Sequence, residues 1–182
     1  LIVDDVMSNV LLLKVLLTNE KFAIATANNG RQALEQVDKE HPDLVLLDVM
    51  MPDLSGFEVA QRLKSNPDTA DIPIIFLTAL NSTTDIVKGF QAGASDFISK
   101  PFNKEELIIR VTHQVSLVAA KRIILNKTEE LQRIIAGRDK LYSVIAHDLR
   151  SPMGSIKMVL NMLMLNLPVE KIGGEMYELL TM

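Results

Sequence analysis

The sequence predicts an α/β fold, in which a five-stranded parallel sheet has helices on both faces and is followed by a long α-helix and a truncated helical hairpin that dimerises. Two observations favour this fold. In the first 100 residues, short apolar runs alternate with segments of helical periodicity, an order typical of parallel sheets. After Pro101 the short runs stop, and residues 103–150 contain no proline and a single glycine, Gly137.

Five apolar runs are the expected strands, at residues 1–3, 22–27, 43–48, 72–77 and 96–99. The third run is apolar between its terminal acids, which is typical of a strand buried on both faces. Helical spacing of apolar residues places helices between the strands, at residues 8–18, 31–39, 57–65 and 84–91. Ser8 is a suitable N-cap for the first helix, and Asn29-Gly30 predicts a turn before the second.

Residues 103–150 are expected to form one helix, which at 1.5 Å per residue would be on the order of 70 Å long. A row of apolar residues at a spacing of seven follows this helix, as in an imperfect coiled coil, with an interruption at Arg138: Leu117, Ile124, Leu131 and Ile145. A break at Gly137 is an alternative. A helix longer than a small domain leaves its apolar stripe uncovered, and a second copy of the chain is the simplest partner.

The expected domains are residues 1–118 for the α/β domain, residues 119–138 for a helical linker and residues 139–182 for an incomplete hairpin. Within this hairpin, a turn is expected at residues 166–174, which contain a proline and two glycines, before a returning helix at residues 175–182.

Composition excludes several classes of protein. The 182 residues are 48% hydrophobic, which excludes a wholly disordered chain. The absence of cysteine excludes a disulfide scaffold, a thiolate zinc site and a cysteine nucleophile. The net charge of −4 argues against a nucleic-acid partner. No apolar run is long enough to span a membrane, and no signal peptide is present. The chain begins without methionine and stops inside an apparent helix, so a cytoplasmic fragment is expected.

Polar side chains follow the expected strands at their carboxyl ends. Asp4 and Asp5 follow the first strand, Asp48 the third, Thr78 the fourth and Lys100 the fifth. Parallel neighbours would bring the three carboxylates to one edge of the sheet, where they repel one another unless a hard cation such as Mg²⁺ joins them. Together with a hydroxyl and an ammonium, they describe a phosphoryl-transfer site. Any one of these residues alone is explained as a cap, but five of them at the ends of four of the five strands are not.

These residues resemble a known family. The acidic pair, the segment LLDVMMPDLSG, Thr78-Ala79 and Lys100-Pro101-Phe102 make the first ~115 residues similar to the receiver domain of two-component response regulators, which has a flavodoxin-like fold. The resemblance implies that Asp48 accepts a phosphoryl group from a phosphohistidine. It also implies that Thr78 and Lys100 bind the phosphoryl oxygens.

The same resemblance assigns the metal site and two further features. Mg²⁺ would be held by Asp4, Asp5, Asp48 and the backbone carbonyl of Met50. The Lys100-Pro101 peptide bond is expected to be cis. Phe97 occupies the place of the family's switch aromatic, and simple core packing is an equal alternative.

The long helix contains a histidine in an unusual neighbourhood, the segment HDLRSP that begins at His147. Asp148 can orient or deprotonate the imidazole, which leaves one ring nitrogen as a nucleophile. Pro152 removes a backbone hydrogen bond within about one turn of the histidine. The other two histidines, His41 and His113, are expected to have no chemical role.

The region of residues 141–165 resembles the dimerisation and phosphoacceptor domain of sensor histidine kinases. The resemblance implies that His147 is phosphorylated, that Asp148 is its acid/base neighbour and that Arg150 contacts phosphate. Ser151 stands where members with phosphatase activity carry threonine or asparagine, so that activity is not expected.

The two resemblances together imply the N-terminal part of a bacterial hybrid histidine kinase. The parent would be an ATP-dependent protein-histidine kinase, and ATP would bind only in a domain absent from these 182 residues. The expected partners are a second copy, through the long helix and hairpin, and a histidine kinase or response regulator that exchanges phosphoryl groups. Two alternatives are a stand-alone phosphorelay carrier and a phosphorylation-independent dimer scaffold. The direction of phosphoryl flow between His147 and Asp48 is left open.

Overall fold

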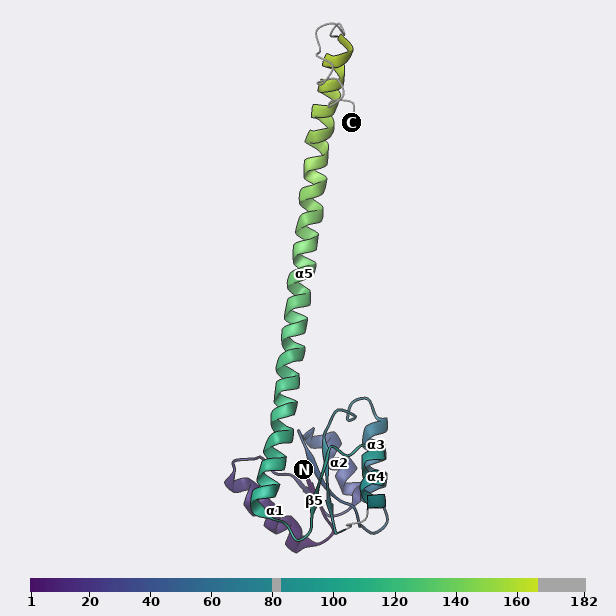
Figure 1. Cartoon of the computed structure of the whole chain (residues 1–182), viewed down its shortest axis with the longest axis vertical. Helices are drawn as coiled ribbons and strands as arrows, with labels where there is room; N and C mark the ends of the chain where they lie inside the picture. Colours follow the sequence, from purple (N-terminus) through teal and green to yellow (C-terminus); the bar gives the residue numbers. More distant parts are fainter. Residues whose placement is uncertain (80–82, 167–182) are drawn as a thin grey trace. The chain divides into compact units, whose positions relative to one another are not determined.

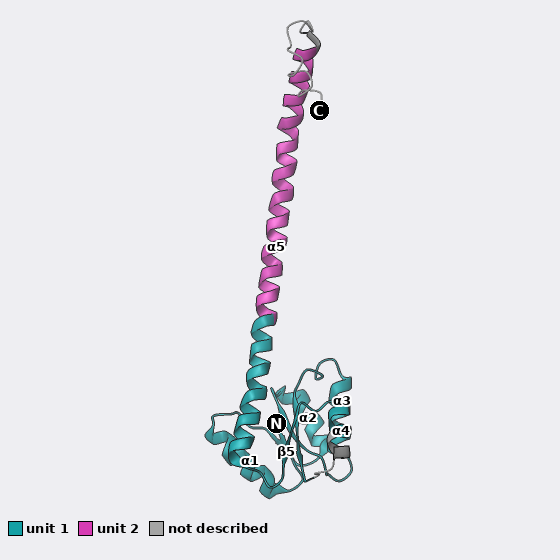
Figure 2. Ribbon diagram, in the orientation of Figure 1, with its two compact units in different colours: residues 1–124 teal, residues 125–182 magenta. Residues whose placement is uncertain are grey.

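The computed structural model describes residues 1–79 and 83–166. It divides into two compact units, Leu1–Ile124 and Leu125–Met182 (Figure 2). The first unit contains the whole sheet, and the described part of the second consists of one helical segment.

The first unit contains the predicted five-stranded parallel sheet, in the order β2-β1-β3-β4-β5. Its strands are β1 Ile2–Val3, β2 Thr26–Ala27, β3 Val45–Asp48, β4 Ile74–Thr78 and β5 Asp96–Ser99. The second strand is shorter than the predicted residues 22–27, because its neighbour β1 has only two residues to pair with it. The prediction of a parallel sheet is confirmed.

Helices cover both faces of this sheet (Figure 1). They are α1 Met7–Asn19, α2 Gly30–Glu40, α3 Gly56–Ser65, α4 Thr83–Gln91 and α5 Lys104–Asn166. Helices α2 and α3 pack on one face, where they bury Val37 and Val59 with Phe76 of β4. Helix α1 and the start of α5 pack on the other, where Leu13 and Leu107 lie in one cluster.

Strands β3 and β4 alternate their side chains between these two cores. Leu47 and Phe76 belong to one cluster, whereas Leu46 and Ile75 belong to the other. Both strands are buried along their whole length, as the apolar run predicted. The sheet is therefore a rigid support for the side chains that follow its strands.

Local sequence explains how three of the helices begin. Asn29 caps α2 by accepting a hydrogen bond from the N–H of Gln32, and Ser55 forms a reciprocal capping box with Glu58 at α3. The prediction that Ser8 caps α1 is wrong. Val6 is the N-cap there, and its N–H is bound by the carboxylate of Asp4 instead.

Helix α5 extends beyond the predicted end near residue 150 and reaches Asn166. It continues through Gly137, where an added Cβ would have nothing within 4 Å, and through Pro152. The alternative of a break at Gly137 is therefore not observed. The predicted turn cannot begin at residue 166, which is helical, and the rest of the turn and the returning helix at residues 175–182 lie outside the described residues. The dimerising hairpin stays a prediction. None of the described helices combines the length and hydropathy needed to cross a lipid bilayer.

Candidate functional site

The polar residues predicted to meet at the strand ends do lie together. Asp4 follows β1, Asp48 and Thr78 end β3 and β4, and Lys100 follows β5, at the same edge of the sheet. The carboxylates of Asp4, Asp5 and Asp48 each place an oxygen within 4.8 Å of the others. Asp4 and Asp48 are buried and Asp5 is exposed, so the cluster opens to solvent at one side.

Lys100 joins the two buried carboxylates. Its Nζ lies 2.8 Å from Oδ2 of Asp4 and 2.8 Å from Oδ2 of Asp48. Burial raises the pKa of Asp48 above its ordinary value, although the hydrogen bond and charge of Lys100 act in the opposite direction. Burial would lower the pKa of Lys100, but its hydrogen bonds to Asp4 and Asp48 outweigh this effect and raise it. The ammonium therefore compensates part of the negative charge of the cluster.

The cluster fits a divalent cation. Oxygen ligands are those that Mg²⁺ prefers, and three carboxylate oxygens already converge here. Asp4 and Asp48 lie in a protein interior that offers few other counter-charges, and the described part of the chain supplies only Lys100 as their ion-pair partner. The carbonyl of Met50 was predicted as a further ligand. Met50 lies two residues after Asp48, and its N–H donates to Oδ1 of Asp48 at 3.3 Å.

Two contacts of the site were not predicted from the sequence. The Nδ2 of Asn9 contacts both carboxylate oxygens of Asp4, and Gly56 approaches the backbone of Asp48 so closely that a Cβ would lie 2.1 Å from its carbonyl oxygen. Helix geometry offered a signal for Asn9, which lies in the first turn of the helix that follows Asp4. No local pattern signals the contact of Gly56, because it depends on how the loop after β3 folds back.

Phe97 is half-buried among other aromatic rings. Its centroid lies 5.8 Å from that of Phe76 and 4.8 Å from that of Phe90. A Cβ at Gly89 would collide with this ring. These contacts are those of a packed core residue, which was one of the two interpretations of Phe97. The Lys100-Pro101 bond is cis, as expected.

His147 lies in the second unit, on the surface of α5. Its side chain is 84% exposed, and its Nδ1 lies 3.2 Å from Oδ1 of Asp148. Arg150 and Ser151 are also exposed. His41 caps the C-terminus of α2 in a left-handed conformation, and His113 is an exposed residue of α5, so neither joins the acidic cluster.

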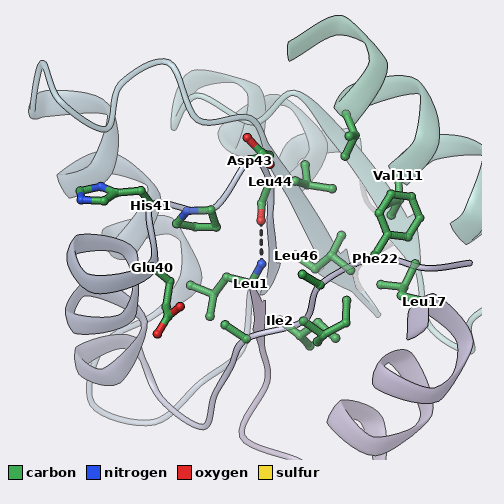
Figure 3. Close-up of a pocket in the computed structure, with 15 residues that line it drawn as sticks. Leu1, Ile2, Leu17, Phe22, Glu40, His41, Asp43, Leu44, Leu46 and Val111 are labelled. Atoms are coloured by element: carbon green, nitrogen blue, oxygen red, sulfur yellow. Dashed lines mark hydrogen bonds between the residues drawn. The ribbon is translucent and has the colours of Figure 1, made fainter. Parts of the chain in front are cut away.

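A cavity of about 310 Å³ lies at the amino-terminal ends of strands β1 and β3, opposite the end that carries the acidic cluster (Figure 3). Leu1, Phe22 and Val111 contribute to its apolar wall, and the amino group of Leu1 donates to the carbonyl oxygen of Leu44 at 2.8 Å. The cavity includes no residue of the acidic cluster, so the phosphoryl chemistry predicted for the chain does not involve it.

Comparison with known proteins agrees with this geometry. Residues 1–112 match the family model of the response regulator receiver domain. The chain belongs to this family. It therefore carries a module of two-component signal transduction, a class of domain that exchanges phosphoryl groups with kinases.

Individual relatives are of two kinds. The response regulator PleD of Caulobacter vibrioides is 42% identical over 138 residues, which cover 76% of this chain and 29% of PleD. The receiver domain of a signal transduction histidine kinase from Syntrophus aciditrophicus is 35% identical, with a TM-score of 0.60 over 63% of this chain and 87% of that one. A receiver domain of a sensor histidine kinase from Pseudomonas aeruginosa PAO1, with magnesium in its active site cleft, is 25% identical. Its TM-score is 0.59, over 63% of this chain and 94% of that one. The family match ends before His147.

Proposed function

We propose that this chain is the receiver and phosphoacceptor-helix part of a hybrid histidine kinase, in which Asp48 takes up a phosphoryl group and α5 couples this event to His147. The observation that carries the receiver part of the proposal is the contact of Lys100 with the buried carboxylates of Asp48 and Asp4, and the part at α5 rests on the exposed imidazole of His147 beside Asp148. Such a site has a nucleophile, a positive charge and cation ligands within a few ångströms.

The reaction at Asp48 is a transfer from phosphohistidine. An oxygen of the Asp48 carboxylate attacks phosphorus, the new O–P bond forms, and the P–N bond breaks with its electron pair going to the imidazole nitrogen, which takes a proton from solvent. Lys100 and the hydroxyl of Thr78 stabilise negative charge on the phosphoryl oxygens. Asp4, Asp5, Asp48 and the carbonyl of Met50 would hold Mg²⁺, which when bound neutralises charge on the carboxylates and the phosphoryl group.

The chemistry at His147 depends on its neighbour. When Nδ1 carries the proton and donates to Asp148, the lone pair of Nε2 is free to accept a phosphoryl group. The exposure of this side chain makes it accessible to a separate ATP-binding domain or to a receiver. ATP would be used by such a domain outside the 182 residues, and the parent would then be a protein-histidine kinase.

Exposed side chains of α5 in the second unit also support the expected homodimer. Two rows of exposed apolar side chains follow α5 at heptad positions: Leu131, Ile145 and Val159 in one row, which Arg138 and Pro152 interrupt, and Ile135, Tyr142, Leu149, Ile156 and Leu163 in the other. The rows alternate by three and four residues, as do the seam positions of a coiled coil. His147 falls at the heptad position farthest from this seam, so pairing of two helices would leave its imidazole accessible.

A second candidate is a response regulator in which α5 leads to an output domain. The match to PleD, which extends over 138 residues, favours this alternative. His147 would then carry no phosphoryl group. The transfer experiment below separates the two functions.

The experiment has two steps. The chain is first treated with acetyl phosphate and Mg²⁺ and mapped by mass spectrometry. We expect one Mg²⁺-dependent adduct on Asp48, and none there in Asp48→Asn. Next, Asp48→Asn carrying phosphohistidine, prepared with phosphoramidate and desalted, is mixed with His147→Gln, which retains Asp48.

The hybrid-kinase proposal predicts transfer from His147 of the first variant to Asp48 of the second. His113→Gln, which changes another exposed histidine of α5, should leave this transfer unchanged when introduced into the donor. Absence of an adduct on Asp48 would contradict the receiver chemistry. An adduct on Asp48 without any phosphoryl group on His147 would contradict the kinase assignment and favour the response regulator.

A further inference from the structure

The side chain of Asn9 makes symmetrical contact with the carboxylate of Asp4. Its Nδ2 lies 3.0 Å from Oδ1 and 3.0 Å from Oδ2 of Asp4. The two oxygens of one carboxylate lie too close together to take one hydrogen each from the same amide nitrogen, so a single N–H of Asn9 is shared between them. Asp4 is 0% exposed, so water does not replace this donor. Asn9 therefore determines how this carboxylate is oriented.

Asp4 accepts from three donors in this arrangement. Besides the amide of Asn9, Oδ1 accepts from the N–H of Val6 at 2.9 Å, and Oδ2 accepts from the Nζ of Lys100 at 2.8 Å. The Nζ of Lys100 also lies 2.8 Å from Oδ2 of Asp48, so it sits between two of the carboxylates that would hold a cation. A cation that binds to both carboxylates therefore competes with Lys100.

Lys100 is the donor that can leave. Its ammonium group is 21% exposed and sits on a flexible four-carbon stem. Val6 donates from the backbone at the start of α1, and Asn9 donates from a short side chain on the first turn of that helix. Neither of these two donors can move away without moving the helix.

We propose that Asn9 is a positioning residue of the cation site, which holds the carboxylate of Asp4 in place while Lys100 exchanges with a divalent cation. The proposal rests on the metal site described under the proposed function. The three carboxylates and one ammonium of the cluster have a formal charge of −2, which a divalent cation matches. Because the amide is neutral, Asn9 fixes Asp4 without changing this charge.

The alternative is that Asn9 only stabilises the start of α1. In that case its replacement would lower the stability of the fold, and the affinity for Mg²⁺ would not change. The two roles are therefore separated by measuring affinity and stability on the same variants.

The test uses the unphosphorylated 182-residue chain, with Mg²⁺ alone as the probe. Asn9→Ala and Asn9→Leu both remove the amide donor, and Leu in addition retains side-chain volume and helix propensity. Asn19→Ala is the matched control, because Asn19 is an exposed residue at the other end of the same helix. Isothermal titration calorimetry gives the Kd for Mg²⁺, and circular dichroism in EDTA shows that each variant is folded.

We expect the Kd for Mg²⁺ to rise about tenfold in both Asn9 variants, the size typical for loss of a hydrogen bond to a metal ligand, and to stay unchanged in Asn19→Ala. A Kd within twofold of the unsubstituted chain in either folded Asn9 variant would overturn the proposal. Failure of both variants to fold in EDTA would also overturn it, because Asn9 would then be structural. Absence of Mg²⁺ binding by the unsubstituted chain would instead show that the proposed metal site itself is wrong.

Discussion

Replacing Gly56 by alanine should displace the peptide of Asp48, the proposed phosphoacceptor. A Cβ at this position would lie 2.1 Å from the carbonyl oxygen of Asp48 and 2.9 Å from the Cα of Val49. Contacts of a Cβ below 3.0 Å are essentially never found, so the two segments must separate by about 0.9 Å. The N–H of Gly56 is bonded to the carbonyl of Val49 at 3.0 Å, which ties both segments together.

The loss of stability in Gly56→Ala should lie near the upper end of the range known for overpacked sites. Extra atoms in a packed site destabilise by about 1–3 kcal/mol, and we expect about 3 kcal/mol because backbone meets backbone here. A domain that is stable by roughly 5–15 kcal/mol stays folded after this loss. A displacement of about 1 Å in a reacting group can slow a reaction by about 100-fold. We therefore expect phosphorylation of Asp48 to slow by about that factor.

Two assays test this expectation. Urea unfolding followed by circular dichroism gives the loss of stability, and intact mass gives the rate of phosphorylation by acetyl phosphate with Mg²⁺. Gly137→Ala is the control, because a Cβ there has nothing within 4 Å, and the change should stabilise the helix by about 1 kcal/mol. The reasoning is refuted if Gly56→Ala is as stable as the unsubstituted chain and is phosphorylated at the same rate.

Three further predictions concern the site, a helix cap and the dimer. In EDTA, Asp48→Asn should be more stable than the unsubstituted chain at pH 7. Because the pKa of Asp48 is raised in the folded state, the free energy of unfolding of the unsubstituted chain falls as the pH rises above 3.8, the ordinary pKa of aspartate, and the variant avoids this loss. The urea unfolding curves of the two proteins should coincide below pH 3.8. Ser55→Ala should cost about 1 kcal/mol in urea unfolding through loss of the capping box, whereas Ser65→Ala at the far end of the same helix should change stability little. The chain has no cysteine, so single cysteines can report which side of α5 faces the second copy. Leu131→Cys on the seam should form an interchain disulfide, and Lys140→Cys, one heptad before His147, should not. Equal disulfide yields from the two variants would contradict pairing along this seam.

The strand-end cluster could be predicted from sequence because it follows from local patterns. Each of its members directly follows an apolar run, and parallel strands place their carboxyl ends together. Asp48 and Thr78 are therefore neighbours for the same reason that β3 and β4 are. The sequence pattern predicts which residues meet at the carboxyl ends of the strands but not which hydrogen bonds they form there. The roles of these residues in phosphoryl transfer stay predictions.

Contacts formed by folding back of the chain could not be predicted in the same way. Ser8 has the side chain of a good N-cap, but Asp4 already binds the N–H of Val6, so the helix begins earlier. Helix α5 extends further than the predicted residues 103–150, because Pro152 removes one backbone hydrogen bond without ending the helix. Gly56 was part of a recognised segment, yet only the structure shows which atom requires its missing side chain.

If α5 couples phosphorylation of Asp48 to His147, as proposed, phosphorylation should also change how two copies of this helix associate. The most direct test of this coupling is the dissociation constant of the homodimer, from sedimentation equilibrium with and without acetyl phosphate and Mg²⁺. We predict a change of at least about threefold, or 0.7 kcal/mol, in the unsubstituted chain. No change is expected in Asp48→Asn, or in a chain with a long flexible insert after Ala119, which interrupts α5. An unchanged dissociation constant in chains whose Asp48 adduct is verified by mass would contradict the coupling.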